Sequence, residues 1–126
     1  MNLALTPIKA SRKLLAVLAS HDTTDFEQFL RPNAYLQVWS ENGRETFVSS
    51  SAVSQALRCI AKSWSKPTVN VESWDETEGA ATVSFQIWGK EQNFLSQHQH
   101  VLTVALHGEQ IDTINLYHQP ISQIAT

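Results

Sequence analysis

The chain of 126 residues is long enough to bury one hydrophobic core, and we expect residues 1–126 to form a single domain. Its formal net charge is −3 and it contains no run of Lys or Arg, which argues against nucleic acid or a membrane surface as a partner. No signal-peptide pattern opens the sequence and no apolar run reaches about 20 residues, so we expect a cytoplasmic protein. The single cysteine, Cys59, falls in a helical pattern and is interpreted as a small buried thiol.

Helical patterns fill most of the first half of the chain. Thr6-Pro7 is typical of a helix start, and the apolar spacing that follows predicts a helix over residues 7–20. The stretch "HDTTDFEQFLRP" predicts a second, short helix with acidic residues in its first turn and Pro32 as its stop. A third helix is predicted in "SSSAVSQALRCIAKSWSKP", whose apolar residues recur at helical spacing.

Strands are predicted in the rest of the chain. Asn42-Gly43 suits a tight turn within the hairpin "AYLQVWSENGRETFV". Four further strands are expected at about 68–74, 80–89, 94–106 and 110–118. Three helices, one hairpin and a four-strand meander together indicate an α+β fold, with the helices on one face of a curved antiparallel sheet.

This order of elements carries a resemblance to a known family. Helix, helix, hairpin, helix and meander at this length resemble the nuclear transport factor 2-like superfamily, which has a cone-shaped, cystatin-like fold. The best local matches are "HDTTDFEQFLRPNAYLQV" and the closing hairpin "HVLTVALHGEQIDTINLYHQ". The superfamily includes ketosteroid isomerases, polyketide cyclases, scytalone dehydratases, limonene epoxide hydrolases and non-enzymatic binding domains, so the resemblance leaves the function open.

The catalytic residues of a ketosteroid isomerase are not matched. In a register aligned with those enzymes, Leu14 stands where they have the oxyanion-holding tyrosine, and Leu30 stands at its supporting tyrosine. Val38 stands at the aspartate base, and Leu102 at the neutral aspartic acid of the oxyanion hole. Isomerisation needs a base near the acidic C–H and donors for the developing oxyanion, so we expect no ketosteroid isomerase activity.

The same register predicts an apolar cavity between the helices and the sheet. Alternation along the strands places one set of side chains inward, with Asp112 as a charged member of that set. The residues expected to line the cavity are Leu14, Leu30, Val38, Val83, Phe85, Ile87, Leu102, Ile114 and Leu116.

Three histidines are expected at one end of this cavity. His98 and His100 share a strand face because residues at i and i+2 point the same way. A three-residue loop at 107–109 would bring the last strand alongside with matching parity. The pairs that it predicts are Leu106 with Gln110, Leu102 with Ile114 and His98 with His118.

His98, His100 and His118 allow three interpretations. They could hold zinc, act as acid/base groups, or form a hydrogen-bonded polar rim, and the last is favoured. The H-x-H spacing alone is a weak metal motif and no carboxylate is placed behind it, so no metal or other cofactor is predicted.

The opposite face of the sheet carries a second set of large side chains. Trp39 and Trp88 fall on the outward parity of their strands, which suggests that this face is covered. We therefore expect a homodimer whose interface includes Trp88, Val101, Ala105 and Tyr117.

These observations predict a small-molecule-binding domain with an apolar cavity, a small hydrophobic ligand and no assigned reaction. The first alternative is an isomerase, dehydratase or cyclase that uses the three histidines on a small hydrophobic substrate. The second is a protein-interaction module whose cavity is filled by side chains.

Overall fold

The computed structural model describes residues 5–20, 26–40, 43–62, 68–91 and 94–120. Within these ranges, the side chains at 20, 68, 88–91, 94–98 and 119–120 lie outside the description. The elements are α1 (Pro7–Ser20), the 3-10 turn η1 (Glu27–Phe29), β1 (Leu30–Ser40), β2 (Gly43–Val48), α2 (Ser50–Lys62), β3 (Thr68–Thr77), β4 (Ala80–Glu91), β5 (Phe94–His107) and β6 (Gln110–Pro120). In the part of the chain described, neither α-helix has the length and apolarity that crossing a membrane requires.

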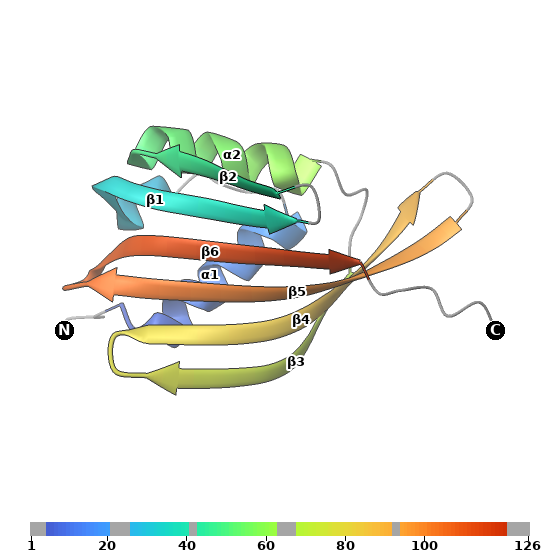
Figure 1. The fold of residues 1–126 in the computed structure, drawn as a ribbon. Helices are drawn as coiled ribbons and strands as arrows, with labels where there is room; N and C mark the ends of the chain where they lie inside the picture. The colour runs from blue at the N-terminus through green and yellow to red at the C-terminus, as the bar shows by residue number, and fades with distance from the viewer. Residues whose placement is uncertain (1–4, 21–25, 41–42, 63–67, 92–93, 121–126) are drawn as a thin grey trace.

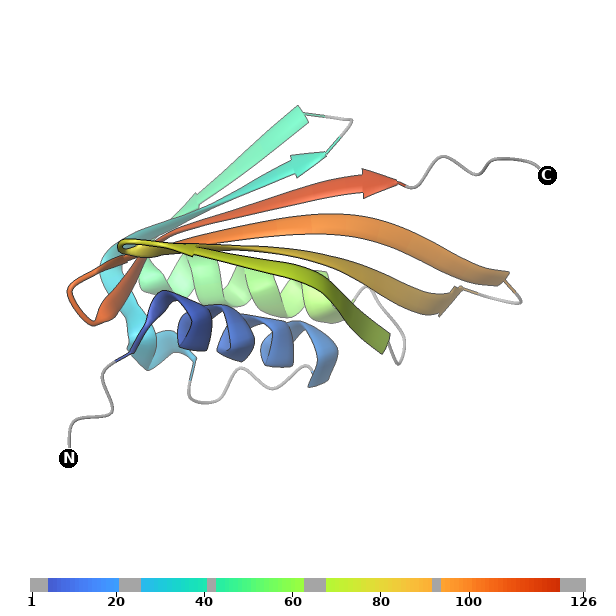
Figure 2. The same cartoon turned by 90° about the horizontal axis from the view of Figure 1, so that it is seen from below.

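The described strands form one curved, six-stranded sheet in the order β2-β1-β6-β5-β4-β3, and both helices lie on its concave face (Figures 1 and 2). The α+β class is confirmed, but the sheet is mixed, because β1 and β6 run parallel while the other neighbours run antiparallel. A parallel pair needs a long crossover connection. Here the crossover consists of β2, α2 and the strands β3 to β5.

α1 begins where the sequence predicts. The backbone N–H of Lys9 donates to Thr6 Oγ1 at 3.2 Å, and that of Ala10 donates to the Thr6 carbonyl at 2.9 Å. The first bond satisfies the Lys9 amide, which has no partner within the helix, and the second is the first bond of the regular helical pattern. Leu14 and Leu18 are fully buried on the side of the helix that faces the sheet.

The predicted second helix is wrong, because the residues described between α1 and β1 contain only the single 3-10 turn η1. Residues 21–25 of the prediction lie outside the described residues. Leu30 already has extended backbone, with φ −88° and ψ 138°. Pro32 disfavours helical backbone at Arg31, so the chain enters a strand where a helix was expected to end. Phe26 and Leu30 are still buried, at 4% and 3% exposure, so this segment contributes to the core without forming a helix.

A tight reversal joins β2 to α2. Ser49 has a φ of 100°, which is uncommon for a residue with a Cβ atom. Its N–H donates to the Ala34 carbonyl at 2.9 Å, and its Oγ accepts from the N–H of Ala52 at 3.1 Å. The side chain therefore caps α2, which then runs back beside the strand it has just left (Figure 1).

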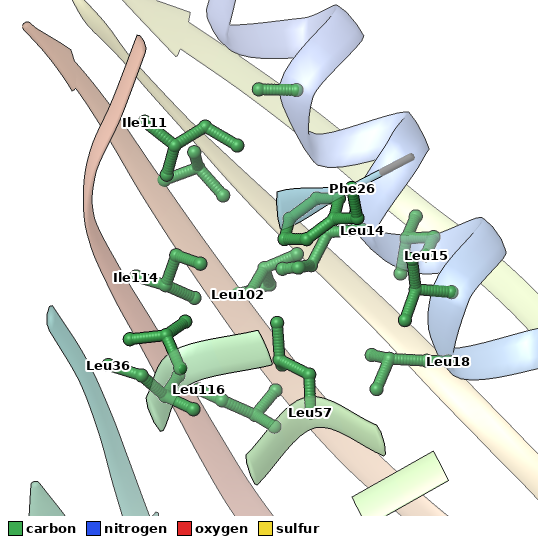
Figure 3. Packing of buried hydrophobic residues seen from close by; sticks show 14 of the residues in the cluster. Leu14, Leu15, Leu18, Phe26, Leu36, Leu57, Leu102, Ile111, Ile114 and Leu116 are labelled. Atoms are coloured by element: carbon green, nitrogen blue, oxygen red, sulfur yellow. The ribbon is translucent and has the colours of Figure 1, made fainter. Parts of the chain in front are cut away.

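The core fills the space between the two helices and the concave face. Figure 3 shows Leu14 of α1 meeting Phe26 and Leu102, and Leu57 of α2 lying close to Leu116. All five side chains are at most 4% exposed. This apolar layer fixes the position of both helices on the sheet.

The hairpin between β5 and β6 has a two-residue turn and a bulge. His107 pairs with Gln110, and Gly108, the first of the two turn residues, has a φ of 66° as in a type II′ turn. Ala105 then pairs with Thr113, which leaves Asp112 as an extra residue in β6.

The predicted three-residue loop is therefore wrong, and so are the pairs predicted from it. Leu106 pairs with Ile111, and Gln110 pairs with the last residue of β5. The observed pairs further along are Val104 with Ile114, Leu102 with Leu116, His100 with His118, and His98 with Pro120.

The bulge also removes Asp112 from the face where it was expected. Its carboxylate Oδ1 accepts a hydrogen bond from Arg31 Nη1 at 2.7 Å, and the two side chains are 33% and 28% exposed. Ile111 and Ile114 on either side of it are fully buried. The extra residue thus lets β6 keep its apolar side chains in the core while the carboxylate reaches a partner at the start of β1.

The Ser49 reversal generates a paired prediction. Ser49→Ala keeps the positive φ and loses the cap, so we expect a loss of about 1 kcal/mol in the free energy of unfolding. Ser49→Gly also loses the cap, but it relieves a backbone strain that costs about 1–2 kcal/mol for residues with a Cβ atom. Since glycine also raises the entropy of the unfolded chain, we expect Ser49→Gly to lie within about 0.5 kcal/mol of the unaltered protein. Urea unfolding followed by circular dichroism measures the free energy of unfolding of both variants. If Ser49→Gly were as unstable as Ser49→Ala, the backbone at Ser49 would not be strained.

Candidate functional site

Directly paired residues of neighbouring strands form rows across the concave face. The row through the centre of the sheet contains Val38, Leu116, Leu102 and Val83, all apolar. The next row toward the C-terminal end of β6 contains His118, His100, Phe85 and Val71. Polar side chains thus enter the concave face at one defined row, beside the apolar core.

His100 is the buried centre of this row, with an exposure of 1%. Its ring stacks on Phe85 with 5.3 Å between centroids and 13° between planes. On the other side the ring of His118 lies 4.8 Å away and is tilted by 37°. Cross-strand pairing accounts for both contacts, because directly opposed residues have Cβ atoms about 5 Å apart.

The third predicted histidine, His98, is placed only by its backbone. It pairs with Ile87 of β4 and Pro120 of β6, two residues along β5 from His100. Its side chain lies outside the described residues. That His98 belongs to the site therefore stays a prediction, whereas the contact between the rings of His100 and His118 is observed.

The two imidazoles allow this row to form hydrogen bonds with a ligand and to transfer protons. A neutral imidazole offers one hydrogen-bond donor and one acceptor, and can also transfer a proton. His100 is buried against an aromatic ring, while His118 is only half-buried and is therefore the more accessible of the pair. Among the described residues, no three His, Cys, Asp or Glu side chains gather closely enough to hold a metal ion.

The residues predicted to line a cavity are part of the core. Val38 is partly buried, and the others are at most 3% exposed; these are Leu14, Leu30, Val83, Phe85, Ile87, Leu102, Ile114 and Leu116. Leu14 and Leu102 meet in the centre of the packing (Figure 3). Their role in lining a cavity stays a prediction.

The convex face carries an aromatic cluster that alternates with the core along the same strands. Trp39 and Tyr117 stack with centroids 5.8 Å apart and planes at 17°, and Trp39 Nε1 donates to Asn115 Oδ1 at 3.4 Å. Of the residues predicted for a dimer interface, Val101 and Ala105 are half-buried and Tyr117 is 40% exposed. The Trp88 side chain lies outside the described residues.

The strand segments across the centre of this face contain no Asp, Glu, Lys or Arg; they are residues 35–39, 82–86, 99–105 and 113–117. Hydroxyl and amide groups occupy many of the outward positions, and Thr82 and Thr103 bring their Oγ1 atoms within 3.4 Å across the strand pair. Charged groups lie at the edges of this face, where the Arg44 guanidinium covers the Trp39 ring and the Glu72 carboxylate accepts a hydrogen bond from Gln99. An uncharged centre with partly exposed tyrosines and charges at the rim is typical of a protein–protein interface.

Cys59 is exposed, so the predicted buried thiol is wrong. The buried stripe of α2 runs through Val53, Leu57 and Ala61, and Cys59 lies about 200° round the helix from Leu57, outside this stripe. There it lines an open groove of about 540 Å³ between α2 and β2. The sequence contains one signal for this groove, a strand followed at once by a helix in "TFVSSSAV", but it gives no sign that the space between them is open.

No protein-family model matches the chain. No curated protein matches it in sequence either.

Solved structures match it closely in fold. A nuclear transport factor 2-like protein of unknown function from Mesorhizobium loti superposes with a TM-score of 0.74 and 13% identity over 90% of each chain. A nuclear transport factor 2-like protein from Anabaena variabilis gives 0.72 and 12% identity over 93% of this chain and 92% of that one. A protein with a ketosteroid isomerase-like fold from Catenulispora acidiphila, in complex with trimethylamine, gives 0.71 and 10% identity over 94% of this chain and 91% of that one. The chain therefore has the nuclear transport factor 2-like fold that its sequence predicted.

Proposed function

We propose that the concave face around His100 and His118 binds a small, largely apolar molecule that carries one polar group, without assigning a reaction to the site. The observation that carries the proposal is the histidine pair itself, which places two hydrogen-bonding rings next to an apolar row. A site of this kind orients a ligand by a few polar contacts, while apolar surface supplies most of the affinity. Crystallisation of the Catenulispora acidiphila protein with trimethylamine supports small organic molecules as ligands of this fold.

The enzymatic alternative rests on the same contact. Ring centroids 4.8 Å apart place two potential proton-transfer groups side by side, and His118 is the more accessible. An isomerase, dehydratase or cyclase acting on a small hydrophobic substrate would need such groups, with His98 as a further candidate. The apolar residues Leu14, Val38 and Leu102 favour a reaction other than steroid isomerisation.

The proposal includes a homodimer formed through the convex face of the sheet. The uncharged strand segments and the stacked Trp39–Tyr117 pair support a surface that is covered in solution. Two-fold contacts that use the same patch on both subunits are the commonest closed assembly.

We also propose a cytoplasmic location for the protein. The exposed thiol of Cys59 suits a reducing compartment.

Ligand binding should depend on the more accessible histidine. We expect apolar phenols and cyclic enones, screened as a fragment set by ligand-observed NMR, to bind, and His118→Ala to weaken their binding by about two- to tenfold. That range corresponds to one hydrogen bond worth about 0.5–1.5 kcal/mol. Titration by calorimetry measures the change.

The matched control is His107→Ala, which removes an imidazole from the exposed turn between β5 and β6. It should leave the affinities unchanged. The proposal fails if no probe binds at about 1 mM, where a specific site should register, or if both variants bind the probes equally well.

Assembly should depend on the convex face. Tyr117→Lys places a charge among the uncharged strand segments at the centre of this face. In a two-fold dimer it brings two like charges together, which costs several kcal/mol. We expect the unaltered protein to sediment as a dimer at about 50 µM and the variant as a monomer. Gln110→Lys adds the same charge at the exposed β5–β6 turn and should remain dimeric. A monomeric unaltered protein, or a dimeric Tyr117→Lys variant with native circular dichroism, would exclude this interface.

A further inference from the structure

The groove between β2 and α2 lies at the edge of the sheet, apart from the histidine row. Its volume is about 540 Å³, and it is lined by Glu45, Phe47, Ala52, Gln55, Ala56, Cys59 and Ile60. The two strand residues face the helix side of the sheet, since they pair with Val38 and Leu36. The remaining members come from a single helix that runs back along β2 (Figure 1).

One wall of this groove is a strand edge that is open to pairing. β2 is the outermost strand, and within the described residues it pairs only with β1. Most of its residues are exposed. Such an edge presents a row of backbone N–H and C=O groups that can accept a further strand. Arg44 does not obstruct the groove, because its guanidinium lies over the Trp39 ring, 5.2 Å from the centroid, with the convex cluster.

The spacing of the helix residues suits the side chains of an added strand. Ala52, Ala56 and Ile60 follow one another at intervals of four residues, which corresponds to about 6 Å along a helix. Alternate residues of a strand are about 6.7 Å apart on one face. A strand beside β2 would therefore place successive inward side chains over this line of the helix. The small Ala52 and Ala56 leave room for them.

A negative charge in the groove favours an occupant with a basic side chain. Among the described residues that line it, Glu45 is the one carboxylate, and its side chain is exposed. It makes no hydrogen bond or ion pair in the described part of the chain. A carboxylate in this position at the rim of an apolar groove complements a Lys or Arg side chain.

We propose that β2 and α2 together bind an extended peptide segment of a partner protein, which adds to the edge of β2 as a further strand. Its inward side chains are apolar over Ala52 and Ala56, and one basic side chain lies at Glu45. Strand addition of this kind obtains affinity from the backbone and specificity from alternate side chains. The site is independent of ligand binding at the histidine pair.

A displayed library of random linear peptides provides the probe. Selection on the unaltered protein should enrich peptides with alternating apolar residues and a Lys or Arg in register. The strand geometry is then tested by N-methylating an enriched peptide at successive positions. Methylation at one alternating set should abolish binding, because those N–H groups face β2, whereas methylation at the other set should be tolerated.

Cys59 provides a direct readout, because it is the single cysteine of the chain and lines the groove. A bound peptide should slow its alkylation by iodoacetamide at least about fivefold at saturation, measured by mass spectrometry. Glu45→Gln should weaken binding by about two- to fivefold, the range of a partly exposed ion pair, while Glu109→Gln in the β5–β6 turn should have no effect. Ala52→Phe, checked for folding by circular dichroism, should fill the groove and abolish binding.

Four outcomes would overturn the proposal. The first is that no peptide is enriched above the Ala52→Phe background. The second is that enriched peptides leave the alkylation rate of Cys59 unchanged. The third is that both N-methylation sets are tolerated. The fourth is that, without any peptide, the alkylation of Cys59 slows as the protein concentration rises. The groove would then be occupied by a second copy of this chain.

Discussion

The extra residue in β6 determines which side chains of that strand face the helices. Side chains alternate along a strand with a period of two, so the turn and any bulge after it decide which set is inward. A two-residue turn alone would pair Ala105 with Asp112 and move Ile114 to the convex face. Because Asp112 is bulged, Ile114 and the alternate residues after it join the face of β5 that contains His100. The core and the histidine pair both depend on this register.

The same bulge is matched by an irregularity in β1. Leu30 pairs with Ile111 and Tyr35 pairs with Thr113, so four residues of β1 lie opposite the single residue Asp112. Pro32 falls within this stretch and has no N–H to donate to a ladder. Arg31 lies there too, and its side chain is held by the bulged carboxylate at 2.7 Å. The two irregularities therefore lie side by side, and there the ion pair between Arg31 and Asp112 joins the start of β1 to β6.

Local signals predicted those parts of the fold that depend on residues near one another in the chain. The cap at Thr6 is an example, because the bonds that it makes are formed within four residues. The register of the last hairpin could not be obtained in this way. A three-residue loop, or a two-residue turn followed by a bulge, brings Ile114, Leu116 and His118 inward alike. The two registers differ in whether Asp112 or Ile111 is inward before them, so alternation along the rest of β6 does not distinguish them. The deciding contact joins Arg31 to Asp112 across 81 positions of sequence.

For the candidate site too, the sequence predicted which face of the sheet the histidines share, but not which of their side chains are in contact. Alternation places His100 on the face of β5 that contains Leu102 and Val104, and an odd number of residues in the loop places His118 on the same face of the sheet. That His118, rather than a residue two positions away, is its neighbour follows from the bulge. The exposure of Cys59 follows from helical spacing, because a residue two positions from both Leu57 and Ala61 lies about 200° round α2 from the buried stripe. The spacing that predicts the stripe therefore predicts an exposed Cys59 as well, against the interpretation of a buried thiol.

Alternation also connects the two faces of the sheet. Tyr117 belongs to the convex cluster and His118 to the concave row, yet they are successive residues of β6. Trp39 stacks on Tyr117, and Arg44 of β2 lies over Trp39, so the edge strand reaches the convex cluster through two ring contacts. Packing at this density does not deform continuously. A shift of β6 would therefore move both faces together. The edge strand is joined to both faces as well, to the ring cluster through Arg44 and to the core through Phe47.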